Sequence, residues 1–134
     1  MTMSADAYDG RHLIAELYGC AGLDDAGLIE CALIDAAAAV RATVLEVRLH
    51  SFGAGQGVTG VALLAESHIS IHTWPERGYA AIDIFLCGRR HDVGAGLAVI
   101  SAALRAGQVD KQVIARGFAT RRNARAMDST ATAR

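Results

Sequence analysis

Apolar and polar residues alternate along several segments of the 134-residue chain, as in strands with one buried and one exposed face. Together with apolar runs bounded by Gly and Pro, this pattern predicts strands over residues 12–18, 43–50, 58–65, 67–74, 79–87 and 109–118. The segment 67–74 places His68, Ser70, His72 and Trp74 on one face. Pro75 and Gly78 predict a turn between the two strands beside them.

Two further segments show the three-to-four-residue spacing of helices. The first, 26–41, follows Asp24 and Asp25, either of which can cap its N-terminus. Its predicted apolar stripe consists of Leu28, Cys31, Ile34, Ala38 and Arg41, with Ile29, Leu33 and Ala37 beside it. The second helix, 93–105, has Asp92 as its predicted N-cap and Gly107 near its C-cap. Residues 1–10 and 119–134 are expected to be frayed ends.

Strands joined by short turns favour an antiparallel sheet, and two amphipathic helices each need cover on one face. The order β-α-β-β-β-α-β therefore predicts one α+β domain, a two-layer sandwich with both helices on the same face of the sheet. The opposite face of that sheet must be exposed to solvent or covered by a partner, and apolar residues on it would favour a dimer.

Composition narrows the class of function. The net charge of −1 lacks the basic excess of a nucleic-acid-binding chain. No apolar run approaches the roughly 18–20 residues that cross a membrane, and the polar N-terminus is unlike a secretory signal. Cys20, Cys31 and Cys87 have no metal-like pairing, which suggests free thiols in the cytoplasm. Cys20 and Cys31 are expected to be small buried residues.

Residues 65–88 carry the most specific signal. They read AESHISIHTWPERGYAAIDIFLCG, which contains ESH-x-x-IHTWPE-x-GYAA-x-D-x-F-x-CG. This pattern is similar to the central motif of prokaryotic S-adenosylmethionine decarboxylases. The preceding GVTGVALLAES and the early GRHLIAELYGC resemble the same family, so the resemblance covers roughly residues 10–118.

The resemblance implies a proenzyme that cuts itself between Glu66 and Ser67. In the family, the Ser hydroxyl attacks the preceding carbonyl, the resulting ester eliminates, and the Ser becomes a pyruvoyl group. Residues 1–66 would become the β chain and 67–134 the pyruvoyl-bearing α chain of one domain. The pyruvoyl group forms a Schiff base with S-adenosylmethionine and accepts electrons as carbon dioxide leaves. The product is decarboxylated S-adenosylmethionine for spermidine biosynthesis, and no metal is expected.

The resemblance also implies roles for single residues. His72 matches the proton acceptor of processing, and Thr59 stands where the family usually has Ser, with its hydroxyl retained. Cys87 matches the proton donor of turnover. Phe52 resembles the aromatic residue that stacks on adenine, although a place in the core suits it equally well. Glu76 resembles the carboxylate that holds the ribose hydroxyls.

The hairpin register gives support that is independent of the resemblance. If Trp74 pairs with Tyr79, Cys87 falls beside position 66 or 67. His72, in contrast, is five residues from Ser67, roughly 16 Å along a strand, and faces the other side of the sheet. Within one subunit these two side chains should not meet. The family resemblance resolves this, because it implies sites at a dimer interface. We therefore expect a homodimer with shared sites, in which one subunit supplies Ser67 and Cys87 and the other Phe52, Thr59, His72 and Glu76.

Other functions remain open. Pyruvoyl-dependent arginine or ornithine decarboxylases on the same fold would show the same self-cleavage, and a non-catalytic homologue would regulate a partner. Glu76 and Phe52 favour the nucleoside substrate, whereas Ser67 and Cys87 favour an enzyme.

Several polar residues receive no function from the sequence. His68 has no assigned role, and Asp83 is either structural or tunes the site. The remaining histidines lack metal-ligand spacing and are expected to be surface or structural residues: His12, His50 and His91.

Overall fold

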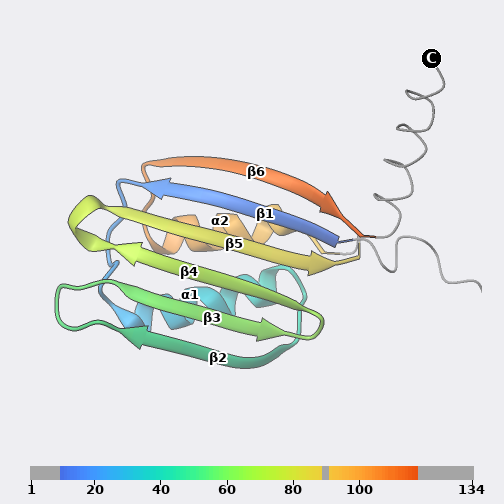
Figure 1. The fold of residues 1–134 in the computed structure, drawn as a ribbon, viewed down its shortest axis with the longest axis horizontal. Coiled ribbons are helices and arrows are strands. Elements are labelled where there is room, and N and C mark those ends of the chain that lie inside the picture. Colours follow the sequence, from blue (N-terminus) through green and yellow to red (C-terminus); the bar gives the residue numbers. More distant parts are fainter. Residues whose placement is uncertain (1–9, 89–90, 118–134) are drawn as a thin grey trace, which may run out of the picture.

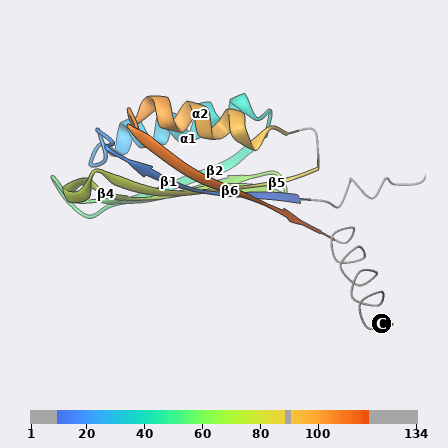
Figure 2. The same cartoon turned by 90° about the horizontal axis from the view of Figure 1, so that it is seen from above.

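The computed structural model describes residues 10–88 and 91–117, which form an antiparallel sheet of six strands covered by two helices (Figure 1). The elements are β1 (Gly10–Tyr18), α1 (Ala26–Ala39), β2 (Val44–Ser51), β3 (Val58–Leu64), β4 (Ser67–Trp74), the 3₁₀ turn η2 (Pro75–Arg77), β5 (Tyr79–Cys87), α2 (Val93–Ala103) and β6 (Gln108–Arg116). The strand order is β2-β3-β4-β5-β1-β6. Figure 2 shows both helices on the same side of the sheet, which confirms the predicted two-layer α+β sandwich.

All six predicted strand segments are present. Four of them, β2 to β5, lie between the two helices, one more than the three in the predicted order β-α-β-β-β-α-β. The predicted pairing of Trp74 with Tyr79 is confirmed, and the same ladder pairs His68 with Phe85. The last strand ends at Arg116. Phe118 and the tail 119–134, as well as residues 1–9, lie outside the described residues.

Aspartates begin both helices, as predicted. The Asp25 carboxylate accepts from the Leu28 amide at 3.0 Å, and Asp92 accepts from two amides at the start of α2. At the other end, Arg105 adopts the left-handed conformation (φ 54°) that terminates α2. The prediction of Gly107 in the C-cap region was wrong, because the Gly107 amide instead donates to the carbonyl of Tyr18 at 2.8 Å.

The predicted apolar stripe of α1 was wrong. The residues buried against the sheet are Ile29, Ala32, Leu33, Ala36 and Ala37. Cys31, Ile34, Ala38 and Arg41 are exposed, and Leu28 is half-buried. Because Ala, Leu and Ile occupy nearly every turn of this helix, the spacing alone did not select a face. The expectation of a buried Cys31 fails for the same reason, and Cys20 is half-buried.

The core lies between the helices and the sheet. α1 packs over β2 and β3, and α2 over β1 and β5. The largest fully buried side chains include Leu13, Leu17, Ile69, Ile71, Ile84 and Leu86 from the sheet and Ile29, Leu33, Ile100 and Leu104 from the helical layer. Burial of each contributes about 1.5–3 kcal/mol. Neither helix in the described part of the chain has the length and apolar character needed to cross a bilayer.

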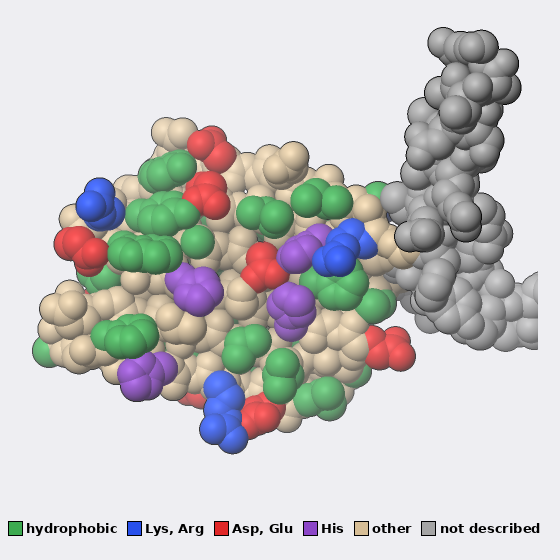
Figure 3. Space-filling view, viewed as in Figure 1, with side chains coloured by type: hydrophobic (Ala, Val, Ile, Leu, Met, Phe, Trp, Pro, Cys, Tyr) green, Lys and Arg blue, Asp and Glu red, His purple; other side chains and the backbone are tan. Residues whose placement is uncertain are grey.

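Neither α1 nor α2 covers the opposite face of the sheet, here called the open face (Figure 2 and Figure 3). Large apolar side chains on this face are between 38 and 42% exposed: Ile14, Tyr18, Leu63, Trp74 and Ile114. Histidine side chains lie among them in Figure 3. A folded monomer would leave this apolar surface in water, which fits the expectation of a partner on this side.

Candidate active site

A tight hairpin places the expected cleavage site at one end of the sheet. β3 ends at Leu64 and β4 begins at Ser67, so Ala65 and Glu66 form the turn between them. Glu66 has a φ of 62°, in the left-handed region. A residue with a Cβ atom pays roughly 1–2 kcal/mol for this conformation. The turn therefore strains the backbone next to the Glu66–Ser67 bond.

Cys87, the last residue of β5, contacts both sides of that bond. Its thiol donates to the carbonyl oxygen of Glu66 at 2.8 Å, and its backbone amide donates to the Ser67 hydroxyl oxygen at 3.2 Å. The predicted placement of position 87 beside 66 or 67 is thus confirmed. The thiol can polarise the carbonyl carbon that the hydroxyl would attack. We call Glu66, Ser67 and Cys87 the cleavage group.

Thr59 and His72 contact each other across β3 and β4. The hydroxyl oxygen of Thr59 lies 3.2 Å from Nδ1 of His72, and the two residues are direct partners in the ladder. When Nδ1 donates to Thr59, Nε2 keeps a lone pair that can accept a proton. His72 is exposed, so this nitrogen is accessible from the open face.

Phe52 and Glu76 lie beyond the same end of these strands. Phe52 is 61% exposed, so the alternative place in the core is wrong, and its ring lies edge-on to His50 with 4.6 Å between centroids. Glu76 is exposed in η2 and lines an open hollow of about 410 Å³. A Cβ atom at Gly57 would collide with the carbonyl oxygen of Thr73, so the loop after Phe52 requires a glycine there. We call Phe52, Thr59, His72 and Glu76 the far group.

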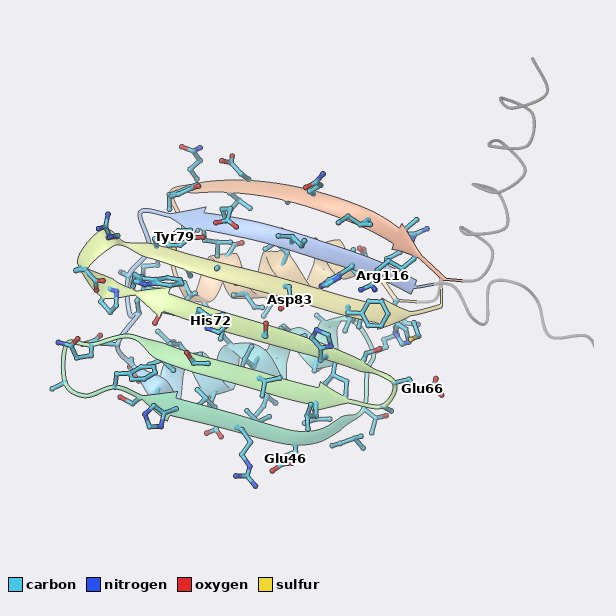
Figure 4. All side chains as sticks on the ribbon, viewed as in Figure 1. Glu46, Glu66, His72, Tyr79, Asp83 and Arg116 are labelled. Carbon is cyan, nitrogen blue, oxygen red and sulfur yellow. The ribbon has the colours of Figure 1, made fainter. Side chains whose placement is uncertain are left out.

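The two groups do not meet within one chain. Five residues of β4 separate Ser67 from His72, about 16 Å in a strand, and side chains at this spacing face opposite sides. In Figure 4, Glu66 lies beyond one end of the sheet, whereas His72 lies over its other half.

A network of polar side chains on the open face was missed by the sequence analysis. Oδ2 of Asp83 accepts from Nε2 of His12 at 2.7 Å and from Nε2 of His68 at 3.0 Å, and Oδ1 accepts from the Ser70 hydroxyl. Arg116 lies 3.3 Å from Nδ1 of His12. Burial raises the pKa of Asp83, but the hydrogen bonds outweigh burial and hold this pKa below its usual value.

Three atoms of this network could in principle bind a metal, because the ligand atoms of His12, His68 and Asp83 lie within 4.8 Å of one another. However, the guanidinium of Arg116 can only donate, so Nδ1 of His12 accepts and Nε2 carries the proton. A metal ligand needs a lone pair at Nε2, so these contacts favour a hydrogen-bond network. No local spacing signals the cluster, since its residues come from β1, β4 and β5.

The other histidines have structural contacts. His91 lies 2.6 Å from the carbonyl oxygen of Val40, to which its Nδ1 donates, and His50 packs on Phe52. On the open face, the hydroxyl of Tyr79 donates to Glu16, which raises the pKa of Tyr79 to about 12, with smaller contributions from burial and nearby charge.

Comparisons with known proteins show the family of the chain. The family model for S-adenosylmethionine decarboxylase matches residues 11–117. The chain is 42% identical over 109 residues to the S-adenosylmethionine decarboxylase proenzyme of Thermomicrobium roseum, covering 81% of this chain and 94% of that one. It is 49% identical over 114 residues to the proenzyme of Methanococcus maripaludis, covering 81% and 90%.

A solved structure is also similar. The adenosylmethionine decarboxylase from Aquifex aeolicus superposes with a TM-score of 0.75 and 36% identity, covering 83% of this chain and 92% of that one. Both the sequence match and the structural match therefore span nearly all described residues. The chain belongs to the S-adenosylmethionine decarboxylase family, whose members are made as self-processing, pyruvoyl-dependent proenzymes.

Proposed function

We propose that the chain cuts itself between Glu66 and Ser67 and, with a pyruvoyl group formed from Ser67, decarboxylates S-adenosylmethionine. The observation that carries this proposal is the double contact of Cys87, thiol to carbonyl and amide to hydroxyl, at that bond. Cleavage would give chains 1–66 and 67–134. They would stay in one domain because β1 in the first chain pairs with β5 in the second.

Processing begins when the Ser67 hydroxyl oxygen attacks the carbonyl carbon of Glu66. The thiol of Cys87 polarises the carbonyl, a base accepts the hydroxyl proton, and the peptide bond is replaced by an ester. Loss of the Ser67 α-proton then expels the Glu66 carboxylate. Addition of water to the resulting dehydroalanine releases ammonia and leaves the ketone. The strained turn would favour cleavage, because Glu66 can leave the left-handed region once its bond to Ser67 is broken, which releases about 1–2 kcal/mol.

The residues around the bond suit the later chemistry as well. A pyruvoyl group supplies a carbonyl that captures the substrate amine and withdraws electrons as carbon dioxide leaves. Cys87 already lies against this position, and we assign it the proton that returns to the substrate carbon. The proposal includes no resident metal. Three free cysteines suit the reducing cytoplasm, where we place the reaction.

We assign the far group of each site to a second copy of the chain. Among the described residues, no base forms a hydrogen bond with the Ser67 hydroxyl, and His72 with its Thr59 partner is suited to the task. Two copies packed by their open faces about a twofold axis perpendicular to the strands would have their strands in opposite directions, so the cleavage group of each would approach the far group of the other. The exposed apolar side chains of that face favour such packing.

The substrate assignment depends on Phe52 and Glu76. An exposed aromatic ring can stack on adenine, and an exposed carboxylate can accept from ribose hydroxyls. Arginine and ornithine contain neither an adenine nor a ribose. Release of carbon dioxide from S-adenosylmethionine, arginine and ornithine, measured side by side, tests this choice. We expect turnover of the nucleoside substrate alone, and efficient turnover of either amino acid would overturn it.

Denaturing electrophoresis and intact mass test the cleavage. We expect two fragments near half of 14.0 kDa, of which the 67–134 fragment reacts with a carbonyl reagent. A single uncut chain that does not react would support the non-catalytic, regulatory alternative.

Mixed dimers test the shared site. Co-expressed Ser67→Ala and His72→Ala chains would form heterodimers in which one site has both residues intact. Random pairing then restores about a quarter of the wild-type sites, although each variant alone is inactive. Absence of restored activity, with heterodimers present, contradicts sharing.

A further inference from the structure

We propose that Asp83 is a positioning residue that holds the chain end created by self-cleavage, and that it does so through the side chain of His68. The inference rests on the proposed cleavage ahead of Ser67. His68 follows Ser67 directly, so the peptide nitrogen of His68 is the remaining covalent attachment of whatever Ser67 becomes.

Cleavage removes one of the two covalent restraints on residue 67. Before it, the residue is held on one side by the tight turn through Glu66 and on the other by His68. Afterwards, Ser67 is the first residue of a chain and lies at the first position of β4. Ends of strands open more easily than their middles, so the reacting group would lie on the least stable part of the strand.

His68 is the first residue of the new chain whose side chain has a fixed partner on another strand. Its Nε2 lies 3.0 Å from Oδ2 of Asp83 on β5, and its ring packs against Phe85 with 5.9 Å between centroids. The imidazole is partly exposed, at 38%, so apolar packing alone does not fix it. A hydrogen bond to a carboxylate is about twice as strong as one between neutral groups.

The carboxylate is itself held by other strands. His12 from β1 donates to the same oxygen at 2.7 Å, and the Ser70 hydroxyl donates to the other oxygen. Arg116 from β6 lies against the far nitrogen of His12. Asp83 thus has little freedom to turn away, and the orientation of His68 follows from it.

The position of Asp83 relates the network to the reaction. Asp83 and Cys87 are on β5, four residues apart and on the same face. One strand therefore fixes both the thiol beside the reacting group and the carboxylate that holds the next residue. If this position served packing alone, a carboxylate with three hydrogen-bond donors would not be needed. An apolar residue of similar size would fill the same space without the desolvation penalty of a charged group.

Hydrogen exchange of the segment 67–74 tests the proposal. We would compare Asp83→Asn with the parent chain in two states, the cleaved protein and an uncleaved Ser67→Ala background. We expect exchange near residue 68 to rise about 10-fold in the cleaved protein and less than about 3-fold in the uncleaved one. Equal increases in both states, no increase in either, or failure of Asp83→Asn to cleave would overturn it.

Substitutions of His68 provide a second test that leaves Asp83 unchanged. His68→Gln retains an N–H donor and is expected to preserve slow exchange, whereas His68→Leu should reproduce Asp83→Asn. In turnover, kcat should fall about 10-fold with KM within about 3-fold, and the double variant should be no worse than either single one. Additive losses would show that the two residues act separately and would contradict the proposal.

Glu16→Gln is the matched control, because it removes the same charge from the same face but contacts Tyr79. We expect unchanged exchange over 67–74 in this variant. A rise equal to that of Asp83→Asn would mean general loosening of the face and would overturn the inference. A parent chain that never cleaves would refute the proposed function instead, which the mass of the protein shows before any exchange is measured.

Discussion

At the cleavage group, the carbonyl, the hydroxyl and the thiol are already in contact, whereas in the far group Thr59 and His72 contact each other and nothing that could react. The first group lies in a strained turn. In the second group, a half-buried Thr59 and an exposed His72 lie within paired strands, and Phe52 and Glu76 lie in the loop and turn beyond them. The activated bond and the base that would act on it are therefore separate parts of one chain.

This difference suggests how the molecule avoids reacting too early. A chain that had its base beside the strained bond could cut itself before the sheet was complete. If a second copy supplies the base, as we propose, cleavage would follow assembly. Substitutions in the cleavage group and in the far group test this separation.

The largest effect is expected from Ser67→Ala. Without the hydroxyl, no ester forms, so the chain should remain uncut and activity should fall by about 10⁴-fold or more. Ser67→Cys, which keeps a nucleophile, should still cut at a reduced rate. Intact mass measures both. Cutting of the Ala variant at the same bond would place the nucleophile elsewhere.

Cys87 should affect turnover more than cleavage. Cys87→Ser keeps a donor toward the Glu66 carbonyl, so we expect cleavage to slow by less than about 10-fold, whereas kcat falls about 10²-fold or more because the proton donor is changed. Misplaced protonation should convert the ketone to an amine as turnover proceeds. Mass spectrometry of the 67–134 fragment detects this product. Equal losses in both steps would contradict the division of roles.

Thr59 tests the far group with a matched pair. Thr59→Val removes the hydroxyl at nearly constant shape, and we expect cleavage to slow about 10-fold through loss of the His72 contact. Thr59→Ser keeps the hydroxyl and frees its rotamer, so cleavage should be unchanged or about 2–5-fold faster. Rates come from the loss of the uncut chain on gels. If Thr59→Ser cut as slowly as Thr59→Val, the hydroxyl would have no part in processing.

The smallest effect concerns stability. Because the folded pKa of Asp83 lies below 3.8, its charged form stabilises the fold above that pH, and this contribution is lost as pH falls through the folded pKa. In the uncut Ser67→Ala background, Asp83→Asn should lower the free energy of unfolding by about 0.5 kcal/mol at pH 7. Urea titrations should show the difference shrinking below pH 3.8. A difference that stays constant at low pH would mean that charge plays no part.

The sequence was sufficient where a pattern is local. The turn at Pro75 and Gly78 fixed the hairpin register, and from it the contact between Cys87 and residue 66 followed. The alternation in β4 likewise separated Ser67 from His72. The face of α1 could not be predicted, because a helix with apolar residues on all sides is oriented by what it packs against and not by its own spacing.

The network around Asp83 could not be predicted either, because its residues are far apart in the sequence. His12, His68 and Arg116 come from three strands, and the pairing of β1 with both β5 and β6 brings them together. That pairing joins the two ends of the chain through long-range contacts, which single-sequence patterns do not specify. The burial of Phe52 could not be predicted for a related reason, since an aromatic residue beside a glycine-rich loop can point into the core or into solvent.

The left-handed Glu66 also bears on whether maturation can be reversed. An intact hairpin imposes this backbone shape, but once the bond after Glu66 is broken, nothing obliges the residue to keep it. The released end can relax to an ordinary extended form, and the conformation needed for rejoining would then have to be regained against a restoring cost. Relaxation of the turn, about 1–2 kcal/mol, would add to the loss of ammonia in preventing the two chains from rejoining.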